Sequence, residues 1–142
     1  MNGEILPVAA GVLFSYAAIG SFFAGFRLLA SRTFLPFHEQ AAGLAWERIP
    51  DRVRLLILGL MRVAGLGAMM TGILCLLDCV PSYFEMTRGV AVIAGGAITL
   101  YWFGVFAVTL YVHKRTRANT PFKSSLSVFA ATAIGTVARA VA

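Results

Sequence analysis

The chain has 142 residues, of which 59% are hydrophobic and 13% are charged, and its formal net charge at pH 7 is +6. Soluble domains carry about 25% charged residues, so this composition excludes an ordinary soluble enzyme or binding domain and indicates an integral membrane protein. The basic residues cluster beside apolar segments, where they report orientation and contact with anionic lipid. We therefore expect no nucleic acid among the partners.

The first apolar segment covers residues 5–30, which is longer than the roughly 20 residues that a transmembrane helix needs. An acidic residue precedes it and basic residues follow it, which is the reverse of a secretory signal peptide. This pattern predicts a retained span with an external N-terminus. Ala17, Ser21 and Gly25 recur at four-residue spacing and predict a face for close helix packing.

A more polar segment follows at residues 31–52 and is bracketed by Pro36 and Pro50. Phe37 and Ala41 would share one face of a helix here, whereas most charged residues would fall on other faces. We expect a short helix lying in the membrane interface, with Trp46 at the level of the lipid headgroups.

The second span is predicted at residues 54–80 and is expected to be the central element of the chain. Asp51 is its expected N-cap, and Ala64, Ala68 and Gly72 repeat the small-residue spacing. Beyond the span, the segment Ser82–Glu85 has the pattern of a capping box and predicts a tight connection to the third span. Spans two and three should therefore be antiparallel neighbours.

The third and fourth spans are predicted at residues 83–112 and 121–142. A basic segment, His113–Arg117, follows the third span, and Thr120 with Pro121 has the pattern of a cap followed by the first helical residue. The expected fold is an all-α membrane protein with a single domain, residues 1–142. It is a four-transmembrane-helix bundle with a short interfacial helix between spans one and two.

Topology follows from the distribution of the twelve basic residues. Nine of them flank or occupy the two loops at residues 31–52 and 113–123: Arg27, Arg32, Arg48, Arg52, Arg54, Lys114, Arg115, Arg117 and Lys123. These loops are expected to be cytoplasmic and both termini outside. We expect the protein in a bacterial inner membrane.

Arg62 is the candidate for a ligand-binding residue within a span, because a buried intramembrane arginine needs a partner or a water-filled cavity. It would bind an anionic group; the alternative is that its side chain reaches back to the interface. Four polar or aromatic residues at mid-membrane depth complete the candidate ligand site: Tyr16, Thr71, Tyr101 and Trp102. The alternative for these residues is ordinary core packing.

Asp78 and Arg139 should both lie near the outer surface, where we expect a structural polar pair. Trp46, Arg115 and Arg117 are the expected contacts with lipid headgroups. Cys75 and Cys79 have neither redox nor metal-binding spacing. We therefore predict no metal, no other cofactor and no catalytic residue.

The favoured function is a small non-enzymatic membrane protein that binds a partner or lipid as an accessory subunit. One alternative is a small oligomeric transporter or channel for an anionic or amphipathic solute, and another is an intramembrane enzyme acting on a quinone or lipid. Expected partners are membrane lipids, including anionic headgroups on the cytoplasmic side, and either further copies of the chain or a larger membrane complex. Small multidrug-resistance transporters are similar in size, but they carry a glutamate inside the first span, where this chain has only Glu4 at its end.

Overall fold

The computed structural model describes residues 2–79 and 88–142. These residues form only helices: α1 (Asn2–Ala30), α2 (Pro36–Ala42), the 3-10 helix η1 (Trp46–Arg48), α3 (Asp51–Asp78), α4 (Arg88–Thr116) and α5 (Phe122–Val141). Four of them, α1, α3, α4 and α5, are long and apolar enough to cross a membrane. The expectation of an all-helical chain with four such helices is therefore confirmed. The predicted capping box at Ser82–Glu85 and the predicted start of the third span lie outside the described residues.

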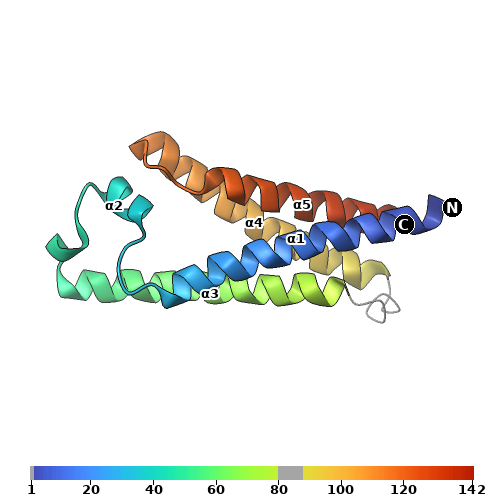
Figure 1. Cartoon of the computed structure of the whole chain (residues 1–142), viewed down its shortest axis with the longest axis horizontal. Coiled ribbons are helices and arrows are strands. Elements are labelled where there is room, and N and C mark those ends of the chain that lie inside the picture. The colour runs from blue at the N-terminus through green and yellow to red at the C-terminus, as the bar shows by residue number, and fades with distance from the viewer. Residues whose placement is uncertain (1, 80–87) are drawn as a thin grey trace.

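The long helices pack in the order α3, α1, α5, α4, and the contacts between α3 and α4 are sparse (Figure 1). Both chain ends lie at one end of the molecule, and α2 and the α4–α5 connection lie at the other (Figure 1). The second and third spans, predicted to be antiparallel neighbours, do contact each other, but much less extensively than α3 contacts α1. Helix α1 packs closely against α3, because the small residues on its face let the backbones of α1 and α3 approach each other.

Two glycines allow the close approach of α1 and α3. A Cβ on Gly65 would lie 2.9 Å from Leu29 Cγ and 3.0 Å from the Gly25 carbonyl oxygen. A side chain at Gly65 would therefore collide with the backbone of α1. The buried ridge of α3 consists of Gly65, Ala68 and Gly72, whereas the predicted ridge began one residue earlier, at Ala64, which is exposed.

Local signals set the described helix ends, with two differences from expectation. Pro50 is the N-cap of α3, and Asp51 is its first helical residue rather than its cap. Pro121 is the N-cap of α5. The Thr120 hydroxyl does not cap that helix, because it donates a hydrogen bond to the Thr109 carbonyl at 2.9 Å.

Helix α2 bridges the two sides of the molecule at the end where α3 and α4 have few contacts. On one side, the Asn119 backbone N–H donates to Gln40 Oε1 at 2.9 Å, which ties α2 to the α4–α5 connection. On the other side, Arg54 Nε of α3 donates to the Trp46 carbonyl of η1 at 3.0 Å, and the Trp46 backbone N–H donates to Glu39 Oε1 of α2 at 3.3 Å. Gly43, with φ of 64°, ends α2 in the left-handed conformation that glycine adopts at low cost. The short helix is thus held across the gap between α3 and α4.

Candidate ligand groove between α3 and α4

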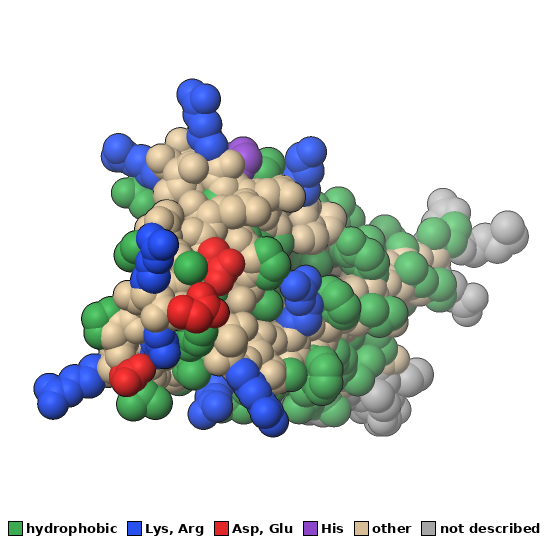
Figure 2. All heavy atoms as spheres, turned by 60° about the vertical axis from the view of Figure 1, so that its left-hand side comes forward, with side chains coloured by type: hydrophobic (Ala, Val, Ile, Leu, Met, Phe, Trp, Pro, Cys, Tyr) green, Lys and Arg blue, Asp and Glu red, His purple; other side chains and the backbone are tan. Residues whose placement is uncertain are grey.

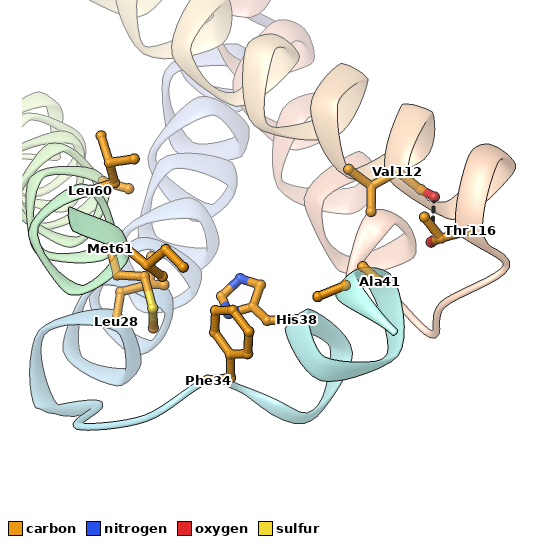
Figure 3. Close-up of a pocket in the computed structure, with 11 residues that line it drawn as sticks. Leu28, Phe34, His38, Ala41, Leu60, Met61, Val112 and Thr116 are labelled. Atoms are coloured by element: carbon orange, nitrogen blue, oxygen red, sulfur yellow. Dashed lines mark hydrogen bonds between the residues drawn. The ribbon is translucent and has the colours of Figure 1, made fainter. Parts of the chain in front are cut away.

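A groove of about 580 Å³ lies between α3 and α4, beneath α2 (Figure 3). Its volume falls in the range of ligand pockets, roughly 300–1,000 Å³. The lining comes from the α1 end, the following loop, α2, α3 and α4: Leu28, Phe34, His38, Ala41, Ala42, Ile57, Leu60, Met61, Ala64, Val112 and Thr116. The groove exists because α3 and α4 have few contacts with each other.

The walls of the groove are almost entirely apolar. On α3 the lining residues Ile57, Leu60, Met61 and Ala64 recur at helical spacing and form one continuous face. Thr116 of α4 is polar, but its hydroxyl donates to the Val112 carbonyl at 2.8 Å. His38 is therefore the polar side chain of the lining that has an atom to offer a ligand.

His38 is half-buried, and its imidazole points into the groove between α1, α3 and α4 (Figure 3). Its Nδ1 accepts a hydrogen bond from the Leu35 backbone N–H at 3.3 Å. Burial among apolar side chains lowers the pKa of His38 from its usual value, because desolvation disfavours the charged imidazolium. The ring is therefore neutral at pH 7, and its proton lies on Nε2, where it can be donated.

Tyr101 lies next to the groove but is not one of its lining residues. Its hydroxyl donates to the Ala64 carbonyl at 3.1 Å and so connects α4 to α3. A Cβ on Gly67 would lie 3.2 Å from the Tyr101 ring, so the glycine leaves room for this aromatic side chain. This hydrogen bond joins α4 to α3 at Ala64, which lines the groove.

Basic residues lie at the end of α4 that contributes Thr116 to the groove, and the Arg115 guanidinium carbon is 5.6 Å from the ring centroid of Tyr111, which is not a lining residue. Lys114, Arg115 and Arg117, here called the basic rim, are exposed and stand beside the lining residue Thr116. Figure 2 shows Lys and Arg side chains gathered on the end of the molecule that carries α2, with hydrophobic side chains covering the flank behind it. The groove therefore lies at the end of the molecule where the basic side chains gather.

Arg62, the predicted anion-binding residue, is exposed on the outside of α3. Val63, the next residue in the chain, and Leu66, one helical turn away, are 69% and 56% exposed, so the surface around Arg62 is otherwise apolar. Arg62 has no ion pair among the described residues and is not one of those lining the groove. A path through the centre of a single chain would not pass its guanidinium group.

The other four candidate ligand residues are engaged in contacts between or within helices. The Trp102 indole N–H donates to Ser21 Oγ at 3.1 Å in the core, and Tyr16 Oη lies 2.8 Å from Ser127 Oγ. The Thr71 hydroxyl donates to the Gly67 carbonyl of its own helix. Tyr101 is bonded to the lining residue Ala64, but none of the four lines the groove, so the structure does not bring these residues together into one site.

Of the three residues predicted to contact lipid headgroups, Trp46 is buried and the two arginines are exposed. Trp46 is buried, with its ring 4.9 Å from that of Phe34 and 5.8 Å from the Arg54 guanidinium carbon. It therefore packs inside the turn between α2 and α3 rather than on the surface. Arg115 and Arg117 are exposed.

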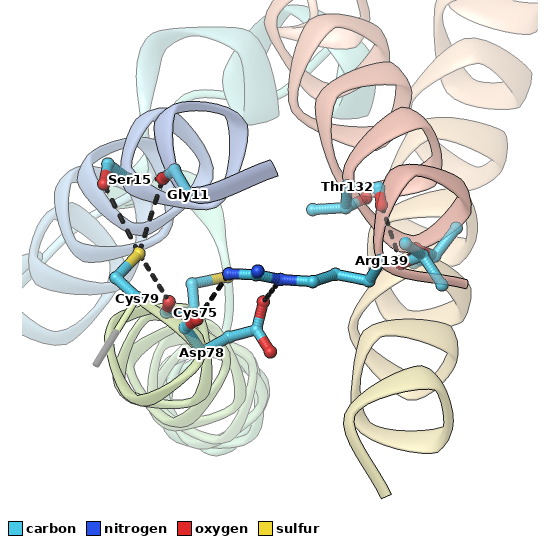
Figure 4. A network of polar contacts seen from close by, with 9 residues as sticks. Gly11, Ser15, Cys75, Asp78, Cys79, Thr132 and Arg139 are labelled. Carbon is cyan, nitrogen blue, oxygen red and sulfur yellow. Dashed lines mark hydrogen bonds and ion pairs between the residues drawn. The ribbon is translucent and has the colours of Figure 1, made fainter. Parts of the chain in front are cut away.

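Asp78 and Arg139 lie together at the other end of the molecule (Figure 4). Arg139 Nε is 3.5 Å from Asp78 Oδ2, and an Nη2 donor reaches the Asp78 carbonyl at 3.0 Å. Nearby, Cys79 Sγ lies 3.4 Å from both Ser15 Oγ and the Gly11 carbonyl oxygen. Within residues 2–79 and 88–142, no group of three His, Cys, Asp or Glu side chains is placed to hold a metal ion.

The sequence interpretation missed His38 as a groove residue. It placed all the candidate ligand residues within the spans. His38 and Ala41 are three residues apart, which places them on the same side of α2, and both line the groove. That spacing was the available signal, but the opposing walls on α3 and α4 come from distant parts of the chain.

Comparison with protein-family models, with curated proteins and with solved structures finds no match to this chain.

Proposed function

We propose that this chain is a small integral membrane protein that binds an amphipathic membrane lipid in the groove between α3 and α4. The observation that carries the proposal is the apolar groove of about 580 Å³ at the end of the molecule where the basic side chains gather. An apolar tail would lie between the helices, and a polar headgroup would remain at the end that carries α2. This is a non-enzymatic binding role, of the kind that an accessory subunit performs.

The membrane position that fits this role puts α2 and the basic rim in the headgroup layer of the cytoplasmic leaflet. Helix α3 has 28 residues and is about 42 Å long at 1.5 Å per residue, whereas the hydrocarbon core is about 30 Å thick. If α3 stands close to the membrane normal, roughly 30% of its length lies outside the hydrocarbon. If that part is the α2 end, Arg62 lies close enough to the interface for its side chain to reach headgroups.

The proposal is tested by filling the groove. Ala64→Phe places a ring in the groove from α3, and Ala41→Phe does so from α2. Ala107→Phe is the matched control, because Ala107 is exposed on α4 and is not one of the lining residues. Each variant is purified in mild detergent, and bound lipid is counted by native mass spectrometry.

We expect both groove variants to retain about tenfold less lipid than the wild type, since overfilling a packed site costs about 1–3 kcal/mol. The Ala107→Phe variant should retain as much as the wild type. Equal retention in all four proteins would refute lipid binding in the groove.

A further inference from the structure

The imidazole of His38 is held in one orientation at the wall of the groove. Its Nδ1 accepts the Leu35 N–H at 3.3 Å, and its ring makes edge contacts with Phe37 and Phe34 at centroid distances of 4.1 and 5.5 Å. Nε2 has no hydrogen-bond partner within residues 2–79 and 88–142, and the ring points into the groove (Figure 3). The groove therefore presents one fixed N–H donor.

A single neutral donor in an apolar groove selects the acceptor that it can bind. A carbonyl oxygen accepts one hydrogen bond and costs little to remove from water, whereas a phosphate in the same place would remain largely undercompensated. The atom that meets Nε2 should therefore be an uncharged carbonyl oxygen attached to an apolar chain.

The basic rim indicates which chemical group lies beyond the carbonyl in the bound molecule. Thr116 lines the groove, and Arg115 and Arg117 on either side of it in the sequence are exposed. The occupant thus meets an apolar groove with one N–H donor, at the end of the molecule where the basic side chains gather. An anionic glycerophospholipid combines an acyl chain, an ester carbonyl and a phosphate, whereas a quinone has no anionic group to complement the rim.

We propose that the groove binds one acyl chain of an anionic glycerophospholipid, whose ester carbonyl accepts a hydrogen bond from His38 Nε2–H and whose phosphate contacts the basic rim. This inference rests on the proposed lipid-binding function and names the lipid and the atoms that select it.

The experiment compares lipids that differ in one feature each. Wild-type protein is equilibrated in mixed micelles with ester-linked phosphatidylglycerol, its ether-linked analogue without carbonyls, phosphatidylcholine or ubiquinone, and bound species are counted by native mass spectrometry. His38→Leu removes the donor, and His38→Gln retains an N–H donor. Arg115→Gln with Arg117→Gln weakens the basic rim and leaves His38 unchanged.

We expect the wild type to prefer the ester lipid to the ether lipid by about three- to tenfold, the effect of one hydrogen bond. His38→Leu should lose this preference, and His38→Gln should keep part of it. The double arginine variant should keep the ester preference but lose the selectivity for phosphatidylglycerol over phosphatidylcholine, by about fivefold or more.

The possible failures are distinguishable. Equal binding of the ester and ether lipids by the wild type, together with reduced lipid binding by Ala64→Phe, would overturn the carbonyl contact. It would leave the proposed function standing. Displacement of phosphatidylglycerol by ubiquinone, with loss of quinone binding in His38→Leu, would overturn the choice of phospholipid. If Ala64→Phe binds every lipid as well as the wild type does, both the inference and the proposed function would be overturned.

Discussion

Asp78 and Arg139 show how single side chains stabilise the end of the molecule opposite α2. Their side chains are only 6% and 9% exposed, and the guanidinium group contacts both the carboxylate and the backbone carbonyl of Asp78. Burying two charges is costly, so such a pair is a weak source of net stability, but removal of one partner leaves a buried charge uncompensated. Removing either charge alone should therefore destabilise the fold more than removing both.

This predicts a non-additive effect on stability. Asp78→Leu should lower the free energy of unfolding by about 3–5 kcal/mol, because the Arg139 charge is left buried without its carboxylate. Arg139→Met should have an effect of the same order, and the double variant should be more stable than either single variant. Thermal unfolding in detergent, followed by circular dichroism, measures the three variants. Additive losses in the double variant would contradict the account.

The pairing of α1 with α3 is the element-scale feature that places the groove. Gly25 and Gly65 let the two backbones approach, and a Cβ on Gly25 would lie 2.9 Å from the Gly65 carbonyl oxygen. No comparable contact surface joins α3 to α4 among the described residues, where one hydrogen bond from Tyr101 to Ala64 spans the gap. The tight contact on one side of α3 thus leaves the other side free to form a groove wall.

Two alanine substitutions on α3 should therefore have opposite effects. Gly65→Ala places a methyl group against the α1 backbone, which cannot move aside alone, and we expect a loss of about 1–3 kcal/mol. Gly59→Ala meets nothing within 4 Å and should raise stability by about 0.5–1 kcal/mol through helix propensity. Thermal unfolding of both variants in one detergent tests this contrast. Equal shifts would indicate that the helices do not approach closely at Gly65.

At the scale of the whole molecule, charge and apolar surface are separated along the long axis. The basic rim and α2 lie at one end, both chain ends lie at the other, and exposed apolar side chains cover the helices between them (Figures 1 and 2). In a membrane whose cytoplasmic side retains Lys and Arg, this polarity favours a cytoplasmic α2 end. The groove would then open to the cytoplasmic leaflet.

The orientation is tested by labelling introduced cysteines. With Cys75→Ala and Cys79→Ser as the background, Asn119→Cys marks the α4–α5 connection and Ala142→Cys marks the opposite end. In spheroplasts of a bacterial host, a membrane-impermeant maleimide should label residue 142 at once and residue 119 only after lysis. The reverse pattern would invert the orientation and move the groove to the outer leaflet.

Local signals along the chain were sufficient for the number, approximate extent and sequence order of the four long helices, because bilayer thickness sets span length and Pro and Gly end helices nearby. They also indicated that the 31–52 and 113–123 loops would lie at the same end. Packing partners were harder to predict. The sequence between the second and third spans predicted that they would be neighbours, and they do contact each other, but the tight glycine contact at Gly65 joins α3 to α1.

The candidate site was decided by tertiary structure. Arg62 was the most conspicuous polar residue of the spans, but the rotation of α3 that buries Gly65 turns Arg62 outward. The same rotation turns Met61 and Ala64 towards His38, which comes from another helix. The groove forms where the facing surfaces of α3 and α4 do not contact each other. Its position depends on how segments distant in the sequence pack together. Apolar length is a local property of the chain, whereas the groove depends on which helix faces find partners.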